Sequence, residues 1–210
     1  MPASPALSPV KRGRKFDQVL DGARTVFLRD GFEGASVDAI AAEAGVSKAT
    51  LYSYFPDKRV LFAEVAKGEC QRQADETEAL VGLNAPPEVV LPIAARRIGE
   101  YFVSEFGRST FRICVAESDR FPELGQEFYD TGPGLLRERI AHYLEGAVAR
   151  GELVIDDIYL AADQFAELCK ADIFPCLCLG VRRDYAPAEL DRIANGAVEM
   201  FMARYGVRKG

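Results

Sequence analysis

The sequence contains no tryptophan and only one histidine, His142. Catalytic dyads that use histidine and metal sites that need several histidines are therefore hard to build from this chain. It also lacks a run of about 18 uncharged apolar residues, which a membrane-spanning helix needs; the longest apolar stretch, 171–181, already contains Asp172 and Pro175. No signal peptide is visible at the N-terminus. We expect a cytoplasmic protein without a metal or other cofactor.

Cysteines are few and odd in number, which favours a reducing compartment over a disulfide scaffold. On an unbroken helix over 157–180, Cys169 and Cys176 would share a face, whereas Cys176 and Cys178 would point about 200° apart. Buried structural thiols are the simpler interpretation, and a redox sensor is the alternative. The five cysteines are Cys70, Cys114, Cys169, Cys176 and Cys178.

Charge is distributed unevenly along the 210 residues. Residues 1–58 have a net charge of +1 and residues 59–210 a net charge of −7, within a total of −6. Four of the five residues from Lys11 to Lys15 are basic. An acidic body with a basic tip predicts that only the N-terminal part meets a polyanion.

Helical spacing of apolar residues continues through almost the whole chain, and no segment reads convincingly as a strand. Phe16, Val19, Leu20, Ala23 and Phe27, for example, form one stripe of a helix. We therefore predict an all-α fold of about nine helices behind a disordered arm at residues 1–10. The expected helices cover 15–31, 37–44, 48–55, 58–78, 88–106, 109–131 with an interruption near Pro122, 134–150, 157–180 and 187–205.

The segment from Ser36 to Lys58 carries the strongest functional signal. Two short helices, each preceded by a serine that can cap it, are joined by a turn that contains Gly45. This arrangement predicts a helix-turn-helix, whose second helix enters the major groove of DNA. Leu51 and Phe55 lie on its inward face. The outward face and its flanks offer short, hydroxyl-bearing and basic side chains from Lys48, Ala49, Thr50, Tyr52, Ser53 and Tyr54.

The run from Gly45 to Phe55, followed by Lys58 and Leu61, resembles the DNA-binding signature of TetR-family transcriptional regulators over residues 15–62. The resemblance implies an all-α homodimer, with a DNA-binding domain at 11–58 and a ligand-binding and dimerisation domain at 59–210. It assigns operator contacts to Ser47, Lys48, Ala49, Thr50, Tyr52, Ser53 and Tyr54, and phosphate or minor-groove contacts to Lys58, Arg14 and Lys15. Asp38 is left out of this set, because an acid is repelled by phosphate and favours a helix N-terminus.

The C-terminal part resembles the AefR-type branch of the same family in the segment from Cys114 to Leu124, in Phe128–Tyr129 and in Gly132–Pro133. This resemblance names no ligand. Pockets between helices are mostly apolar with a few polar groups, so we expect an apolar or aromatic effector. Candidate pocket residues are Phe102, Phe106, Phe111, Tyr129, His142, Tyr143 and Phe165.

The last two expected helices are assigned to the homodimer. An apolar stripe runs along 187–205, and the segment 171–179 is apolar on nearly every side. The resemblance places such helices in a four-helix bundle across a two-fold axis. The members of the stripe are Leu190, Ile193, Ala194, Ala197, Val198, Phe201, Met202 and Tyr205.

Together these features predict a ligand-responsive bacterial repressor that a small molecule releases from a palindromic operator, and that is nucleoid-associated when bound. Two alternatives are a redox-responsive regulator and a helical protein-interaction module that does not bind DNA. An enzyme is not expected, because the sequence has no Gly-rich phosphate loop, no Cys-x-x-Cys motif and no histidine pair.

Overall fold

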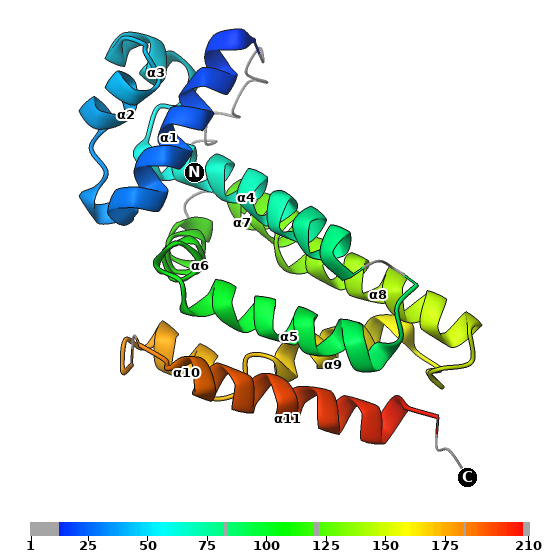
Figure 1. Ribbon diagram of the computed structural model, residues 1–210. Helices are drawn as coiled ribbons and strands as arrows, with labels where there is room; N and C mark the ends of the chain where they lie inside the picture. The colour runs from blue at the N-terminus through cyan, green and yellow to red at the C-terminus, as the bar shows by residue number, and fades with distance from the viewer. Residues whose placement is uncertain (1–12, 82–83, 120–121, 183, 208–210) are drawn as a thin grey trace. The chain divides into compact units, whose positions relative to one another are not determined.

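The computed structural model (Figure 1) describes residues 13–81, 84–119, 122–182 and 184–207. The chain forms two compact units, of which the first ends at Val65 and the second begins at Ala66. Helix α4 (Lys58–Val81) crosses this boundary. The expected boundary at residue 58 falls earlier because the first two turns of α4 belong to the core of the first unit. The expected arm at residues 1–10 lies outside the described residues.

The first unit is built from α1 (Arg14–Gly34), α2 (Val37–Glu43), α3 (Lys48–Tyr54) and the start of α4. Gly31, at φ 69°, interrupts the helical backbone of α1, as expected of a glycine that ends a helical run. The helices close around a small aromatic core in which Phe62 meets Phe27 and Phe32 edge to face. Its buried members include Phe16, Val19, Ala23, Phe27, Ile40, Leu51, Phe55, Leu61 and Phe62.

Helices α1 and α2 approach each other closely at Gly22. A Cβ atom placed on Gly22 would lie 2.7 Å from the backbone nitrogen and from the Cβ of Ala44. Real carbon atoms do not pack at such distances, so a side chain here would force the two helices apart. The contact fixes how the end of α2, and the turn that follows it, sit against α1.

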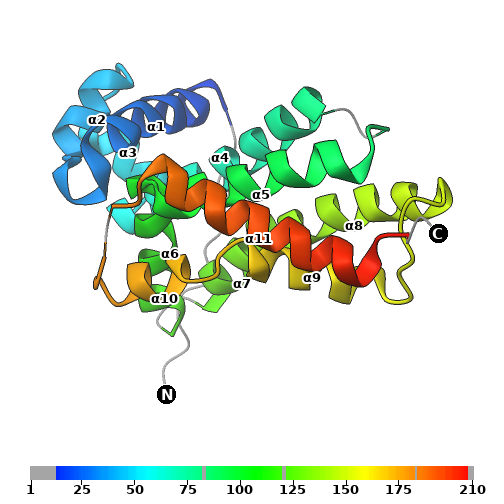
Figure 2. The same cartoon turned by 60° about the horizontal axis from the view of Figure 1, so that its bottom comes forward.

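The second unit contains the rest of α4 and seven further helices. Helix α11 runs alongside α5 in both Figure 1 and Figure 2, and α8 packs against α9. The largest core cluster joins residues of α5, α8, α9 and α11 around Leu144 and Phe165. The seven helices are α5 (Pro87–Val103), α6 (Glu105–Ser118), α7 (Pro122–Thr131), α8 (Pro133–Ala149), α9 (Ile158–Leu168), α10 (Ile173–Cys178) and α11 (Pro187–Tyr205).

The all-α class is confirmed, although the described residues form eleven helices rather than about nine. The interruption expected near Pro122 is present and divides the expected helix at 109–131 in two, one ending at Ser118 and the next beginning at Pro122. The expected helix at 157–180 breaks after Leu168, and Asp172 adopts a left-handed backbone with φ 68°. Cys169 and Cys176 therefore do not share a face of one continuous helix, and that prediction is wrong.

The prediction that the apolar stripe of α11 faces a partner chain is also wrong. Six of its eight members are buried in the core of the second unit: Leu190, Ile193, Ala194, Ala197, Phe201 and Tyr205. They face α5, α9 and α10, because α11 is amphipathic and its own subunit already offers an apolar surface to cover. Among the described residues, no helix is long and apolar enough to cross a membrane.

Candidate functional site

The helix-turn-helix is held by local hydrogen bonds that the sequence predicts. The hydroxyl of Ser36 accepts a bond from the backbone nitrogen of Ala39 (3.0 Å), and that of Ser47 accepts one from Thr50 (3.1 Å). Gly45 adopts φ 63°, and the nitrogen of the following Val46 donates to the Ala41 carbonyl (3.0 Å). These caps satisfy donors that a short helix leaves open, so α2 and α3 begin where the serines stand.

Helix α3 presents one buried face and one open face. Leu51 and Phe55 are buried, as predicted. On the open side, the hydroxyls of Ser47 and Thr50 lie 2.9 Å apart, and Ser53 donates to the Thr50 carbonyl (2.6 Å). Tyr54 is partly buried with its ring against Phe16. The remaining members of the predicted contact set are exposed: Ser47, Lys48, Ala49, Tyr52 and Ser53.

The ammonium of Lys48 forms an ion pair with the carboxylate of Asp38, across the turn between α2 and α3. Both side chains are more than half exposed, so the pair adds little to stability. Its effect is local: it holds the lysine beside the open face of α3 and neutralises its charge. The sequence indicated a dipole role for Asp38 and missed this contact, which joins residues ten positions apart on two different helices.

Lys58 has a structural role that the sequence did not indicate. Its Nζ donates to the carbonyl oxygens of Phe32 (2.8 Å) and Ala35 (3.0 Å) at the end of α1. It also lies 4.3 Å from the centre of the Phe32 ring. These contacts satisfy carbonyls that the end of α1 leaves open. A phosphate contact by Lys58 stays a prediction, and it would use the remaining hydrogen of the same ammonium group.

The predicted basic contacts before the first helix are partly described. Arg14 and Lys15 lie in the first turn of α1, and both side chains are exposed. Lys11 and Arg12 lie outside the described residues. The two described cations are therefore free of the core and accessible to a phosphate backbone.

A cavity of about 280 Å³ lies inside the second unit. Residues from α4, α5, α6, α7, α8, α9 and α10 line it, and most of its surface is apolar. Four of the seven predicted pocket residues are in its wall: Phe102, Phe111, Tyr143 and Phe165. The hydroxyl of Tyr143 donates to the carbonyl of Ala85 (2.9 Å), which fixes its ring in the wall.

The other three predicted pocket residues lie elsewhere. Phe106 is buried beside Gly107, which lines the cavity in its place. Tyr129 and His142 are exposed, whereas their neighbours Phe128 and Tyr143 line the cavity. The reason is geometric: one position along a helix turns a side chain by about 100°. Apolar spacing alone did not separate the cavity face from the faces beside it.

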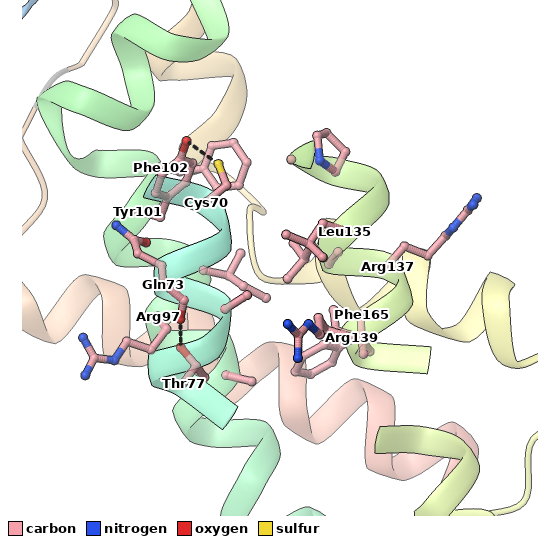
Figure 3. A pocket seen from close by; sticks show the side chains of 18 of the residues that line it. Cys70, Gln73, Thr77, Arg97, Tyr101, Phe102, Leu135, Arg137, Arg139 and Phe165 are labelled. Atoms are coloured by element: carbon pink, nitrogen blue, oxygen red, sulfur yellow. Dashed lines mark hydrogen bonds between the residues drawn. The ribbon is translucent and has the colours of Figure 1, made fainter. Parts of the chain in front are cut away.

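The sequence missed the contribution of α4, which lines the cavity with Cys70, Gln73, Ala74, Thr77 and Glu78. Their spacing places these residues on one face of the helix, and this stripe of small and polar residues was the available signal. The Sγ atom of Cys70 and the hydroxyl of Tyr101 lie 3.4 Å apart, in hydrogen-bond contact (Figure 3).

The charged groups around the cavity are mostly paired with one another. Arg139 forms ion pairs with Asp75 (2.5 Å) and with Glu78 on α4. Lys170 pairs with Glu167 (2.5 Å) and lies about 5 Å from the rings of Phe102 and Phe174. The cavity thus has aromatic walls, and two of the cationic side chains that line it are held in ion pairs.

Four of the five thiols lie in surroundings that favour the protonated form. Burial raises the pKa of Cys114 and of Cys169 to about 12, and it raises the pKa of Cys70 and of Cys178 as well. The thiolate is the reactive form, so these groups are poor nucleophiles near neutral pH. Among the described residues, no group of three or more His, Cys, Asp or Glu side chains is placed to hold a metal ion.

The two units together define a class of protein: a helix-turn-helix regulator with a second, helical domain. Residues 19–65 match the family model for bacterial regulatory proteins of the tetR family. Residues 90–207 match the model for the C-terminal domain of AefR-like transcriptional repressors. The chain therefore belongs to the TetR family of DNA-binding transcriptional regulators, which are not enzymes.

Solved structures of this family resemble the chain over nearly its whole length. A TetR-family transcriptional regulator from Mesorhizobium loti is 32% identical, with a TM-score of 0.77 over 92% of this chain and 98% of that one. The flavonoid-responsive regulator FrrA is 35% identical, with a TM-score of 0.68 over 94% of this chain and all of that one.

Curated relatives match a shorter part of the chain. The transcriptional repressor AcnR of Corynebacterium diphtheriae is 31% identical over 71 residues, which are 34% of this chain and 37% of AcnR. The chain thus matches just over a third of the length of this relative. The match supports DNA-binding regulation and carries no information on the effector.

Proposed function

We propose that the protein is a dimeric repressor that leaves a palindromic operator when a small apolar or aromatic molecule enters the cavity. The observation that carries this proposal is the path of α4. The helix begins in the DNA-binding unit, where Lys58 binds the end of α1, and its C-terminal half lines the cavity. A ligand that displaces α4 therefore acts on an element that both units share.

Operator recognition is assigned to the open face of α3. Short side chains at Ala49 and Ser53 let the backbone approach base edges, while Thr50 and Tyr52 offer hydroxyls to bases or phosphates. Lys48, Lys58, Arg14 and Lys15 supply positive charge for the phosphate backbone. In the DNA-bound state a phosphate competes with Asp38 for Lys48, so Asp38 restrains non-specific binding.

Dimerisation is needed because one short helix reads only a few base pairs. The buried stripe of α11 does not supply the interface, but exposed apolar side chains remain on α9, on α11 and directly after α10. An isologous contact through these side chains would bring two copies of α3 to a two-fold symmetric operator. They are Tyr159, Leu160, Leu179, Val181 and Met200.

Effector control follows from a difference in ligand affinity between the DNA-bound and the DNA-free conformations. The size of the cavity suits one small molecule, and its walls suit an apolar or aromatic one. The name of FrrA states a response to flavonoids, which are small aromatic molecules, and this relative is similar to the chain over both units. That similarity supports a small-molecule effector for this chain.

Selection from a random duplex library, at about 150 mM salt, tests the DNA-binding part of the proposal. The expected result is an inverted repeat whose half-site spacing reports the separation of the two α3 helices. Folded protein that selects no motif and shows no salt-dependent affinity for DNA would contradict the proposal. That outcome would favour a helical protein-interaction module.

Two substitutions on α3 then distinguish contacts with DNA bases from contacts with the phosphate backbone. Thr50→Ala or Tyr52→Ala should lower affinity for the operator by about tenfold, and affinity for random DNA by less, since base contacts carry the specificity. Tyr129→Ala is the matched control, because Tyr129 is as exposed as Tyr52 (46% and 49%) and lies in the second unit. Fluorescence anisotropy with both duplexes measures the effect. Equal losses on both duplexes would reduce Thr50 and Tyr52 to phosphate contacts.

A further inference from the structure

Two uncharged polar side chains in the cavity wall contact each other. Tyr101 of α5 and Cys70 of α4 meet there through a hydroxyl and a thiol, 3.4 Å apart, with either atom able to donate (Figure 3). The surrounding wall is made of aromatic rings from several helices. Those rings belong to Phe102, Phe111, Phe128, Phe165 and Phe174.

Two of the four cationic side chains that line this cavity are held in close ion pairs. Arg139 is paired with two carboxylates, and Lys170 is paired with Glu167. The guanidinium groups of Arg97 and Arg137 extend away from the cavity in opposite directions (Figure 3). A carboxylate that entered this space would lose its hydration and compete with existing carboxylates for Arg139 and Lys170, which is costly.

The tyrosine and the cysteine are themselves uncharged. Burial raises the pKa of Tyr101 well above its usual value and also raises the pKa of Cys70. Both groups therefore stay protonated near neutral pH, and each can donate or accept a hydrogen bond. A thiol is a weak partner in both roles. A ligand hydroxyl that replaced Cys70 beside Tyr101 would form the stronger bond.

We propose that Tyr101 is the specificity-determining residue of the cavity, and that with Cys70 it selects an uncharged aromatic effector that carries a hydroxyl group. The aromatic side chains of the wall pack against the ring system of the ligand. The hydroxyl of Tyr101 forms with the ligand's hydroxyl the hydrogen bond that water would otherwise form. Because the ligand displaces a contact between α4 and α5, binding also loosens α4 from its neighbour. This inference rests on the proposed effector-binding function of the cavity.

Three compounds with the same ring body test the selectivity: 4-phenylphenol, biphenyl and biphenyl-4-carboxylate. Isothermal titration calorimetry with the full chain measures their dissociation constants near pH 7.5. We expect 4-phenylphenol to bind about tenfold more tightly than either of the others, the worth of one good hydrogen bond. The carboxylate differs from the phenol in its charge, and biphenyl differs in lacking a polar group.

Tyr101→Phe is the decisive variant, because it keeps the ring and removes only the hydroxyl. It should weaken 4-phenylphenol by about tenfold and leave biphenyl unchanged. Tyr143→Phe is the matched control, since Tyr143 also lines the cavity but gives its hydroxyl to the carbonyl of Ala85. This control should keep the preference for the phenol. Thermal unfolding of both variants verifies that they are folded.

The possible outcomes separate this inference from the function on which it rests. Tightest binding of the carboxylate would overturn the inference and point to Lys170 as the determinant. Equal binding of all three would overturn the role of Tyr101 while leaving the cavity as a ligand site. If none bound, both the inference and the effector site would fail. Release of operator DNA by the ligand is measured in a separate experiment. A ligand that binds the cavity without releasing the DNA would contradict the proposed function, but it would not contradict the selectivity for a hydroxyl group.

Discussion

Both units of this chain are built from amphipathic helices, but they place their candidate functional residues differently. The first unit packs a small aromatic core and places its candidate functional residues on an outer face, along α3. The second unit buries a larger core and leaves an aromatic cavity of about 280 Å³ inside it. The difference suits the contacts proposed for each unit: a reading helix needs an exposed face to enter a DNA groove, and a small molecule needs an apolar pocket.

Hydrogen bonds to backbone groups hold the helices of the first unit, and most of them are local in sequence. Caps at Ser36 and Ser47, the turn at Gly45 and the ammonium of Lys58 all satisfy backbone groups within the unit. The second unit depends more on contacts between distant helices, such as α11 against α5. Substitutions that test packing should therefore act differently in the two units.

The largest effect is expected at Gly22. Gly22→Ala would place a Cβ 2.7 Å from the backbone nitrogen and the Cβ of Ala44, directly after α2, so the two helices must move apart, at a cost of about 3 kcal/mol in the free energy of unfolding. Urea unfolding followed by circular dichroism measures this cost. Gly34→Ala is the control within the same unit, since its Cβ would meet only the Cβ of Asp30, at an ordinary 3.5 Å. A Gly22→Ala protein as stable as the control would contradict close packing of α1 on α2.

Lys58 provides the next test, because it has both a structural and a predicted DNA-binding role. Lys58→Met keeps most of the stem but removes two hydrogen bonds from a charged donor, so the free energy of unfolding should fall by about 2 kcal/mol. The slope of log affinity for DNA against log salt should also fall by about one if the lysine touches phosphate.

Lys15→Met is the comparison for Lys58, since Lys15 is an exposed lysine in the first turn of α1. It should change the salt slope by a similar amount with no measurable loss of stability. A Lys58→Met protein with an unchanged salt slope would assign Lys58 to structure alone.

The smallest expected effect concerns open space in the second unit. Ala94 lines the cavity, whereas its neighbour Ala95 is buried in the packed core. Ala94→Leu should stabilise the protein by about 1 kcal/mol and block ligand binding, because the added carbons fill the cavity. Ala95→Leu should destabilise it by about 2 kcal/mol through overpacking. Thermal unfolding and calorimetry measure both effects, and equal destabilisation by both variants would argue against an open cavity.

The helix-turn-helix could be predicted in detail because its determinants are local. Capping serines, a glycine in the turn and the inward pair Leu51 and Phe55 act over a few residues, so their spacing in the sequence carries the geometry. The family assignment from the run Gly45–Phe55 is confirmed for the same reason. Lys58 was the exception, since its partners Phe32 and Ala35 lie more than 20 positions away.

The cavity was predicted less completely. Phe102, Phe111, Tyr143 and Phe165 were recognised as aromatic and inward, but an inward face does not distinguish a core from a pocket. Phe106, Tyr129 and His142 fell on neighbouring faces, because one residue of offset turns a side chain by about 100°. The wall formed by Cys70 on α4 depends on how α4 lies against α5, which no local pattern encodes.

The sequence by itself determined the helical class, the position and caps of the DNA-reading helix, and the separation of a basic N-terminal tip from an acidic body. These features depend on side-chain spacing within one or two turns of helix. Tertiary structure alone decided three others: the burial of the α11 stripe in its own subunit, the pairing of Lys48 with Asp38, and the meeting of Tyr101 with Cys70. Each of the three joins separate helices, and the way helices pack in space sets which of their faces meet.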